Sequence, residues 1–368
     1  MLSSTFNHSI PPTTPTSPTS PTPPKKEKTM KNKTRLLWQL PFLTFLVIGT
    51  VIIVGRQNNA EYRNNHGMIF GTTYNITYQS DQNLELGMKA VLQEVDNALS
   101  PFNPKSVITA VNENRRVKLN AMFTEVYRRA MEISAATDGA FDITVAPIVN
   151  QWGFGFKTKQ FPDKQDIDSI MQFVGYKKLR MEDGRIIKDD PRTMLDCSSI
   201  AKGYGCDKVA EYLRSKGVEN FMVEIGGEIV VKGSNPKGKP WKIGVSKPVN
   251  DSLAVNRDMQ AVINISNCAM ATSGNYRNFY FKNGKKYAHT VDPKTGYPVQ
   301  HNILSATVIA GDCTTADAFA TAFMVMGLDG AKAVLNRHSD IMAYLICSGD
   351  NGENTVWCSP KLERMIAK

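Results

Sequence analysis

The stretch LSATVIAGDCTTADAFATAFMVM, residues Leu304 to Met326, decides the fold that we expect. Its first part, LSATVIA, is rich in β-branched residues and stops at a glycine, which is typical of a strand; a helix is predicted over Thr314 to Met326. Similar runs precede it, namely FMVEI from Phe221, EIVV from Glu228, WKIGV from Trp241 and AVINI from Ala261. Because the strands come in runs and do not alternate strictly with helices, we predict an α+β fold and not a doubly wound sheet.

The segment before these runs indicates one more strand and two helices. Side chains from Phe70 to Tyr78 alternate in the two-residue period of a strand. Apolar residues from Leu84 to Leu99 follow helical spacing up to Pro101. A second helix is predicted from Phe123 to Ile133, closed near Gly139. No internal repeat is evident, and we assign residues 67–368 to one domain.

The N-terminal part explains most of the positive charge. The chain of 368 residues carries a formal net charge of +10, and Met1 to Arg56 contains seven lysines and arginines against one glutamate. The uncharged run Leu36 to Gly55, LLWQLPFLTFLVIGTVIIVG, is about as long as a helix that crosses a membrane. We therefore attribute the charge to membrane topology and expect no nucleic-acid partner.

This run can be an anchor or a cleavable signal peptide. It is long for a signal peptide and lacks a clear small-x-small cleavage site, so we predict an uncleaved transmembrane anchor over residues 36–55. Residues 1–35, rich in Pro, Thr and Ser and then basic, are predicted to be a disordered cytoplasmic tail. Residues 56–66 are a polar linker to the exported domain. Met30 also begins a basic and then apolar leader, so Met1 and Met30 are both possible starts.

Two oxygen-bearing side chains share one face of the helix predicted after Thr314. Asp317 and Thr321 are four residues apart and point the same way. A carboxylate and a hydroxyl suit Mg²⁺, which takes few protein ligands and completes its shell with water and phosphate oxygens. The spacing alone fits better with an acidic residue that only stabilises the first helical turn.

The segment LDCSSIAKGYGCDKVAEYL leads from an extended piece into a helix at Ala201, Lys202 and Gly203. Free N–H groups at such a helix start, with a lysine beside them, can bind phosphate. Glycine and serine also form ordinary turns, so this signal is weak by itself.

Two aromatic stretches and one histidine complete the candidate chemistry. GAFDITVAPIVNQWGFGF from Gly139 and TSGNYRNF from Thr272 could enclose a planar ring system, or simply belong to the core. His289 and Asp292 lie in the turn-rich segment KKYAHTVDPKTGYPV. Histidine is a natural general base, although an isolated loop histidine more often only makes hydrogen bonds.

The six cysteines have no C-x-x-C spacing, so neither a zinc site nor a redox motif is indicated. An exported domain permits disulfides, and buried free thiols are equally compatible with the sequence.

Taken in order, these segments resemble the ApbE family from Gly67 to about Ala331. The resemblance rests on FGTTYNITY, GAFDITVAP with WGFG, LDCSSIAKGYGCD, VEIGGEIVVKG, ATSGNYRNF, HTVDPKTGYP and DCTTADAFATAFMVMG. It implies an ApbE-like fold of mixed or antiparallel sheets with packed helices. It also implies a bacterial inner-membrane protein with its catalytic domain on the periplasmic side.

The resemblance further implies FAD as substrate, Mg²⁺ as cofactor, and transfer of FMN to a threonine of an acceptor protein with release of AMP. The implied metal ligands are Asp317, Thr321 and the backbone carbonyl of Ala201. The implied FAD contacts are Phe70, Phe102, Ala140, Phe141, Asp142, Ser198, Lys202 and Val291. His289 is the expected base, and Asp292 is the second candidate catalytic residue.

Two features depart from the family pattern. The family often has methionine at the position of Phe70, and many members are lipoproteins, whereas no cysteine precedes Cys197 here. The predicted helix from Leu36 to Gly55 would replace the lipid anchor. Membrane redox subunits are the expected acceptors, and an FAD pyrophosphatase or a non-catalytic exported FAD-binding protein are the alternative functions.

Overall fold

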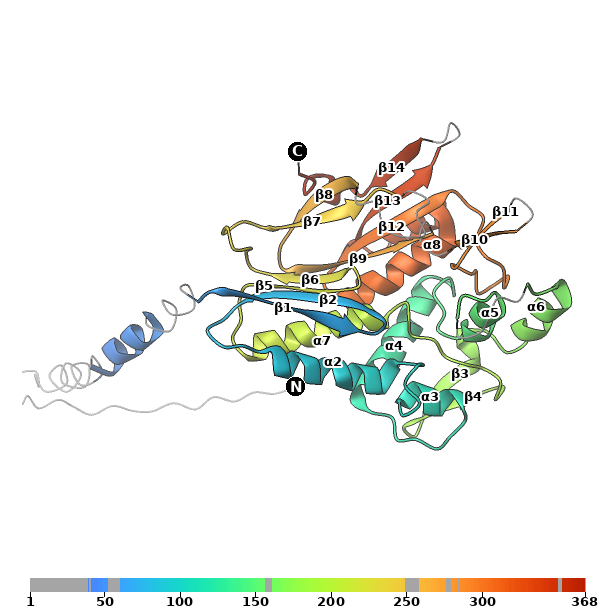
Figure 1. Cartoon of the computed structure of the whole chain (residues 1–368), viewed down its shortest axis with the longest axis horizontal. Helices are drawn as coiled ribbons and strands as arrows, with labels where there is room; N and C mark the ends of the chain where they lie inside the picture. The colour runs from blue at the N-terminus through green and yellow to red at the C-terminus, as the bar shows by residue number, and fades with distance from the viewer. Residues whose placement is uncertain are drawn as a thin grey trace, which may run out of the picture. The chain divides into compact units, whose positions relative to one another are not determined.

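The computed structural model describes Gln39 and residues 41–51, 60–155, 161–248, 258–275, 279–282, 285–349 and 353–367. The chain divides into two units, Met1–Asn59 and Ala60–Lys368. In the first unit, Pro41–Val51 forms an apolar helix (Figure 1). Apart from this helix and Gln39, the predicted anchor and the predicted tail over residues 1–35 lie outside the described residues, so the anchor stays a prediction.

The second unit is built on an eight-stranded sheet in which every neighbouring pair is antiparallel (Figure 1). The strand order is β1-β2-β5-β6-β9-β12-β13-β14. These strands are β1 (Tyr62–Ile69), β2 (Thr72–Gln79), β5 (Phe221–Ile225), β6 (Glu228–Lys232), β9 (Cys268–Gly274), β12 (Ile303–Ala310), β13 (Met342–Ser348) and β14 (Asn354–Cys358). This sheet and its helices confirm the predicted α+β class.

Strands in the middle of the sheet are buried on both faces. In β12, Val308 packs among the helices, whereas Ile309 packs with β7 (Trp241–Ser246) and β8 (Met259–Ile265). In β6, Val230 and Val231 divide in the same way between two cores. Successive side chains of a strand point to opposite faces, so a continuous β-branched run such as LSATVIA fits a strand that is covered on both sides.

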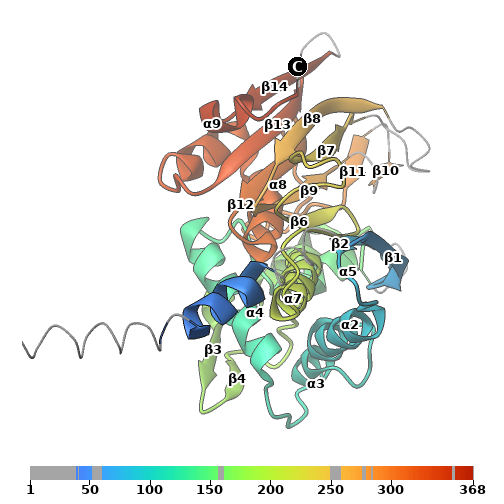
Figure 2. The ribbon, with the colours of Figure 1, turned by 90° about the vertical axis from the view of Figure 1, so that its left-hand side faces the viewer.

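The main helices are α2 (Glu85–Leu99), α4 (Ala121–Ala136), α7 (Ala201–Ser215) and α8 (Cys313–Leu335). All four lie where we predicted helices, α2 and α4 from apolar spacing and α7 and α8 from the segments after an extended run, although α8 continues beyond Met326 to Leu335. Figure 2 shows α2, α4 and α7 on one side of the sheet and the β7–β8 pair on the other. A short helix, α9 (Pro360–Glu363), buries Leu362 in the same core as β7 and β8.

Smaller elements surround this frame. They are the helices α3 (Val107–Asn112), α5 (Ala146–Gln151) and α6 (Lys164–Met171), the 3₁₀ turn Tyr176–Lys178, and the two-stranded pairs β3 (Leu179–Glu182) with β4 (Arg185–Lys188) and β10 (Phe279–Lys282) with β11 (Lys285–Ala288).

The first strand begins earlier than we expected. β1 starts at Tyr62, inside the segment 56–66 that we predicted as a linker, and pairs with β2 through the two-residue turn Phe70–Gly71. Its polar residues gave no strand signal because β1 lies at the edge of the sheet, where most of its side chains stay partly exposed.

Helix α8 is the one described helix that is long and apolar enough to cross a membrane by length and composition. Its side chains nevertheless form the centre of the domain, with Ala316, Phe319 and Phe323 at most 2% exposed. Its apolar composition therefore reflects burial among protein elements, which gives the same pattern as a membrane span.

Candidate active site

The site is built where the N-terminal ends of α7 and α8 meet. A side chain at Gly203 would place its Cβ 2.3 Å from the carbonyl oxygen of Cys313 and 2.9 Å from Cβ of Asp317. Only glycine permits this approach, and the backbone N–H of Gly203 donates to Oδ2 of Asp317 at 3.0 Å. The glycine after Lys202 thus brings the predicted phosphate site and the predicted metal ligand together.

The start of α8 is held by two carboxylates. Asp312 accepts a hydrogen bond from the N–H of Thr315 at 2.7 Å, which is an N-cap. Asp207 of α7 accepts from the N–H groups of Cys313 and Thr314, both at 2.8 Å, and from the Thr314 hydroxyl. These bonds lock α8 against α7 and so fix Asp317, one turn further on.

Lys202, Glu228 and Asp317 form a charged cluster at this junction. Nζ of Lys202 lies 3.0 Å from Oε1 of Glu228 and 3.9 Å from Oδ1 of Asp317. Burial raises the pKa of Glu228 to about 8 and also raises the pKa of Asp317, while the Lys202 charge opposes both shifts. Burial lowers the pKa of Lys202, but the two carboxylates outweigh burial and raise it. Lys202 therefore stays cationic.

The cluster is suited to a cation. Two carboxylates face one ammonium group, and the buried Oε2 of Glu228 has no hydrogen-bond partner among the described residues. An unsatisfied buried carboxylate oxygen is costly unless a cation or donor reaches it. Across the described residues no group of three or more His, Cys, Asp or Glu side chains could hold a metal ion by itself. Mg²⁺ fits this setting because it needs few protein ligands.

Thr321 lies where helical spacing predicts, one turn after Asp317 on the same face. Its hydroxyl is 3.1 Å from the Ser273 hydroxyl on β9, and both residues line the same cavity as Asp317. Ala201 is the first residue of α7, directly before Lys202. Asp317 and Thr321, two of the ligands that the family resemblance implies for Mg²⁺, therefore line one cavity.

A cavity of about 480 Å³ opens above this cluster. Ten of the thirteen residues named from the sequence line it: Phe102, Ala140, Phe141, Asp142, Ser198, Lys202, His289, Val291, Asp317 and Thr321. They come from segments that lie up to about two hundred residues apart in the chain. The volume and the mixture of aromatic, apolar and charged walls are typical of a site for a cofactor-sized ligand.

Asp142 shapes one wall from within. Its carboxylate accepts hydrogen bonds from the N–H and the hydroxyl of Thr144 and from the N–H of Tyr176, at 2.7 to 2.8 Å. Burial raises its pKa, and these bonds oppose the shift. Asp142 thereby anchors the loop that presents Ala140 and Phe141 to the cavity.

His289 also lines the cavity, next to an aromatic cluster. The His289 and Phe154 rings meet edge to face with centroids 6.4 Å apart, and Phe154 stacks on Tyr280 at 5.1 Å. Tyr287 continues the stack from Tyr280 to Trp152. The packed rings set the position of the imidazole at the cavity wall.

Three of the named residues, Ala201, Phe70 and Asp292, do not line the cavity. Phe70 occupies the β1–β2 turn with φ of 53° and packs its ring against Gly205 of α7. Asp292 accepts bonds from the N–H of Lys294 and the hydroxyl of Thr295, and so closes the turn after His289. Both residues support elements that carry the site.

Sequence reasoning left Glu228, Phe154, Thr272 and Ser273 without a role, although all four line the cavity. Each lies in a segment that we quoted, and a signal existed for Glu228, because a carboxylate at the start of a β-branched strand calls for a partner. The six cysteines are free thiols, four of them buried.

A model of the ApbE family matches residues 70–346. The chain belongs to the ApbE family. The FAD:protein FMN transferase of Haemophilus influenzae is 38% identical over 303 residues, 78% of this ApbE-family chain and 86% of that protein. The one from Vibrio cholerae is 36% identical over 313 residues, 82% and 92% of the two chains.

Solved structures agree with this family assignment. The flavin transferase ApbE from Vibrio cholerae has a TM-score of 0.75 and 34% identity and covers 83% of this chain and 99% of its own. The apo form of the flavinyl transferase ApbE from Pseudomonas stutzeri has a TM-score of 0.74 and 29% identity, with 83% and 97% covered. The predicted family and ApbE-like fold of this domain are confirmed.

Proposed function

We propose that this ApbE-family chain is an FAD:protein FMN transferase that splits FAD, attaches FMN to a threonine of another protein and releases AMP. The observation that carries the proposal is one cavity that is lined by the Lys202–Glu228–Asp317 cluster and by His289. The curated relatives, at up to 38% identity, have this activity in their names.

Different residues bind the pyrophosphate, the ring systems and the metal ion in this reaction. The Lys202 ammonium anchors the pyrophosphate of FAD, because the N–H groups of Ala201 and Gly203 already donate to the Cys197 carbonyl and to Asp317. Phe102, which is 74% exposed and lines the cavity, offers an aromatic face to a planar ring system, and the buried Phe141 supports the wall. Asp317, Thr321 and the Ala201 carbonyl hold Mg²⁺, which neutralises charge on the phosphates when it is bound.

His289 removes the proton from the acceptor hydroxyl. The threonine oxygen forms a bond to the FMN-side phosphorus, the P–O bond to the AMP phosphate breaks, and the leaving AMP takes the electron pair of that bond. The hydroxyl proton moves to the His289 imidazole. Asp292 contributes by closing the turn that follows His289.

We further propose a single-pass anchor over residues 36–55 in a bacterial inner membrane, with the catalytic domain on the periplasmic side. The uncharged run and its basic flank support this topology. The acceptor is then an exported part of a membrane redox subunit, such as one of a sodium-pumping NADH:quinone oxidoreductase or an Rnf-type complex.

The test incubates the purified chain with FAD, Mg²⁺ and a candidate acceptor subunit. We expect in-gel flavin fluorescence on the acceptor and release of one AMP for each FMN attached. Release of AMP and free FMN without labelled protein would instead identify an FAD pyrophosphatase. FAD that stays bound and intact in Mg²⁺ would identify a flavin carrier.

A further inference from the structure

A second pocket, of about 350 Å³, lies between the β3–β4 hairpin and the segment that follows α3. Its cationic side chains are Arg115, Arg116, Arg185 and Lys188, and no carboxylate lines it. Apolar residues, among them Leu119 and Ile186, form the rest of the wall. We call this site the basic pocket.

The charges of the basic pocket are largely uncompensated. Arg116 and Arg185 make no ion pair or side-chain hydrogen bond within the described ranges. Lys188 donates to Oδ1 of Asn114 at 2.9 Å and to the Asn112 carbonyl at 3.4 Å, both neutral acceptors. Burial lowers the pKa of Lys188 to about 8. Only Arg115 has a carboxylate partner, Glu113 at 2.6 Å.

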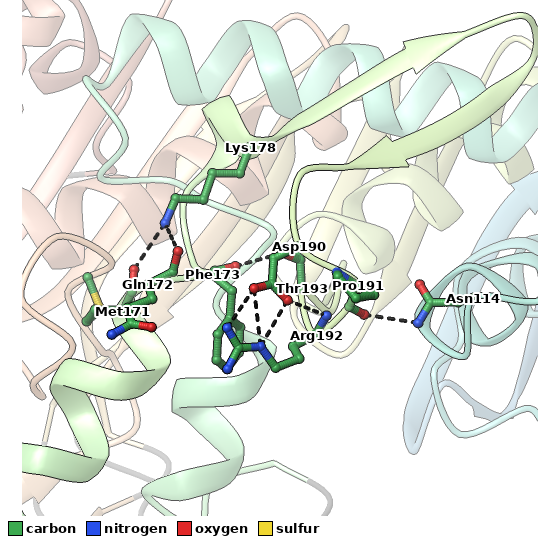
Figure 3. Close-up of polar contacts among 9 residues, drawn as sticks. All are labelled: Asn114, Met171, Gln172, Phe173, Lys178, Asp190, Pro191, Arg192 and Thr193. Atoms are coloured by element: carbon green, nitrogen blue, oxygen red, sulfur yellow. Dashed lines mark hydrogen bonds and ion pairs between the residues drawn. The ribbon is translucent and has the colours of Figure 1, made fainter.

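Nearby carboxylates are engaged elsewhere. Arg192 holds Asp190 at 2.6 Å, and Arg180 holds Asp189 at 2.6 Å (Figure 3 shows the first pair). Apart from Arg115, the cations of the basic pocket therefore pair with no carboxylate of their own chain in the described structure. An anion from outside would be their natural partner.

The wall of the pocket is already formed. Figure 3 shows the turn at Asp190 to Thr193 tied to its surroundings. Asn114 donates to the Pro191 carbonyl at 3.0 Å, and the Thr193 hydroxyl donates to the Phe173 carbonyl at 2.8 Å. Lys178 donates to the carbonyls of Met171 and Gln172 and ties β3 to the end of α6. A preformed wall loses little entropy when a ligand binds.

Two hydrogen-bonded links join the basic pocket to the catalytic cavity. Asn112 donates to the Leu195 carbonyl at 2.8 Å and accepts from its N–H at 2.7 Å, next to Asp196 of the cavity wall. Arg115 donates to the Pro104 carbonyl at 3.0 Å, two residues after Phe102. The walls of the basic pocket and of the catalytic cavity are therefore connected by direct hydrogen bonds, although no residue lines both.

We propose that the basic pocket docks an acidic segment with apolar flanks on the acceptor protein. This inference rests on the proposed transferase function. The cations recognise the carboxylates of the segment and the apolar wall receives its flanks. A polypeptide is favoured over a lipid headgroup because the transfer reaction already brings an acceptor protein to this domain.

The test measures binding of a candidate acceptor subunit to the full chain in phosphatidylcholine nanodiscs without FAD, so that it does not depend on transfer. The double variant Arg116→Glu/Arg185→Glu should raise the Kd for the acceptor about ten- to a hundredfold, with weaker salt dependence. FAD affinity should stay within about twofold, which shows that the variant folds.

The matched control is Lys237→Glu/Lys242→Glu, which changes the charge equally at two exposed lysines without ion pairs in the described structure. It should leave the Kd within about twofold.

An unchanged Kd in the pocket variant, or a wild-type chain that does not bind the acceptor, would overturn the inference. The inference would also be overturned if the pocket variant lost only its binding of short-chain phosphatidylglycerol, because the pocket would then be a lipid site. Failure of the proposed function is distinct, because it would appear as tight acceptor binding without FMN transfer.

Discussion

At the residue scale, the site combines charged and aromatic side chains within one cavity. Lys202 faces two buried carboxylates, and His289 is placed by aromatic neighbours. The combination of charged and aromatic side chains matches a ligand with a pyrophosphate at its centre and ring systems at its ends. Substitutions at these residues should therefore separate binding from chemistry.

His289→Ala tests the role of the imidazole. If His289 accepts the threonine proton, the variant should bind FAD normally but lose transfer by about 10² to 10⁴-fold in single-turnover measurements. His66→Ala, at an exposed position on β1, is the control and should keep the wild-type rate. A normal rate at saturating FAD together with weaker FAD binding would show that His289 only supports the loop.

Asp317→Asn tests the metal ligand without changing the size of the side chain. The loss of a charged ligand should raise the Mg²⁺ concentration for half-maximal transfer by about tenfold or more. Asp312→Asn, on the same helix, should keep this concentration because asparagine caps a helix as well as aspartate does. Ala201→Gly should also be mild, since Ala201 offers only its carbonyl. Undiminished turnover in excess EDTA would contradict the metal site.

At the element scale, the crossing of α7 and α8 organises the catalytic residues. Asp207 and Asp312 saturate the first N–H groups of α8, and Gly203 lets α7 approach it closely. Helix α8, whose length and composition resemble those of a membrane span, is therefore the central support of the site.

Gly203→Ala should separate α7 from α8. A methyl group cannot fit 2.3 Å from the Cys313 carbonyl, so we expect a loss of about 1–3 kcal/mol in the free energy of unfolding. The rate of FMN transfer should be affected more strongly than the free energy of unfolding, because Ala201 and Asp317 move apart. Gly311→Ala, where the added methyl meets nothing within 4 Å, is the control. Thermal unfolding and Mg²⁺ titration would measure both effects, and equal behaviour of the two variants would refute the packing argument.

At the scale of the whole molecule, the chain joins an apolar N-terminal helix to a catalytic domain. The described part of that helix, Pro41–Val51, is shorter than a membrane span. The proposed anchor therefore depends on the full uncharged run and its basic flank.

A reporter that is active only in the periplasm tests this topology. Fused after Arg56 it should be active, and fused before Leu36 it should be inactive, because the lysines and arginines from Lys25 to Arg35 keep the N-terminus in the cytoplasm. The opposite pattern of activity would exclude the anchor. A fusion directly after Leu335, the last residue of α8, should be active as well.

The sequence by itself determined the α+β class, the main helices and the central strands, because periodicity and β-branching report burial directly. It also determined the family, through seven ordered segments. It did not reveal β1, since an edge strand can be polar, or the roles of Glu228 and Phe154. Only the tertiary structure placed the Glu228 carboxylate against Lys202, the Phe154 ring against His289, and the unpaired arginines in one pocket. The physical reason is that charge pairing and ring packing depend on distance in space, and these partners come together only when the sheet and helices have assembled.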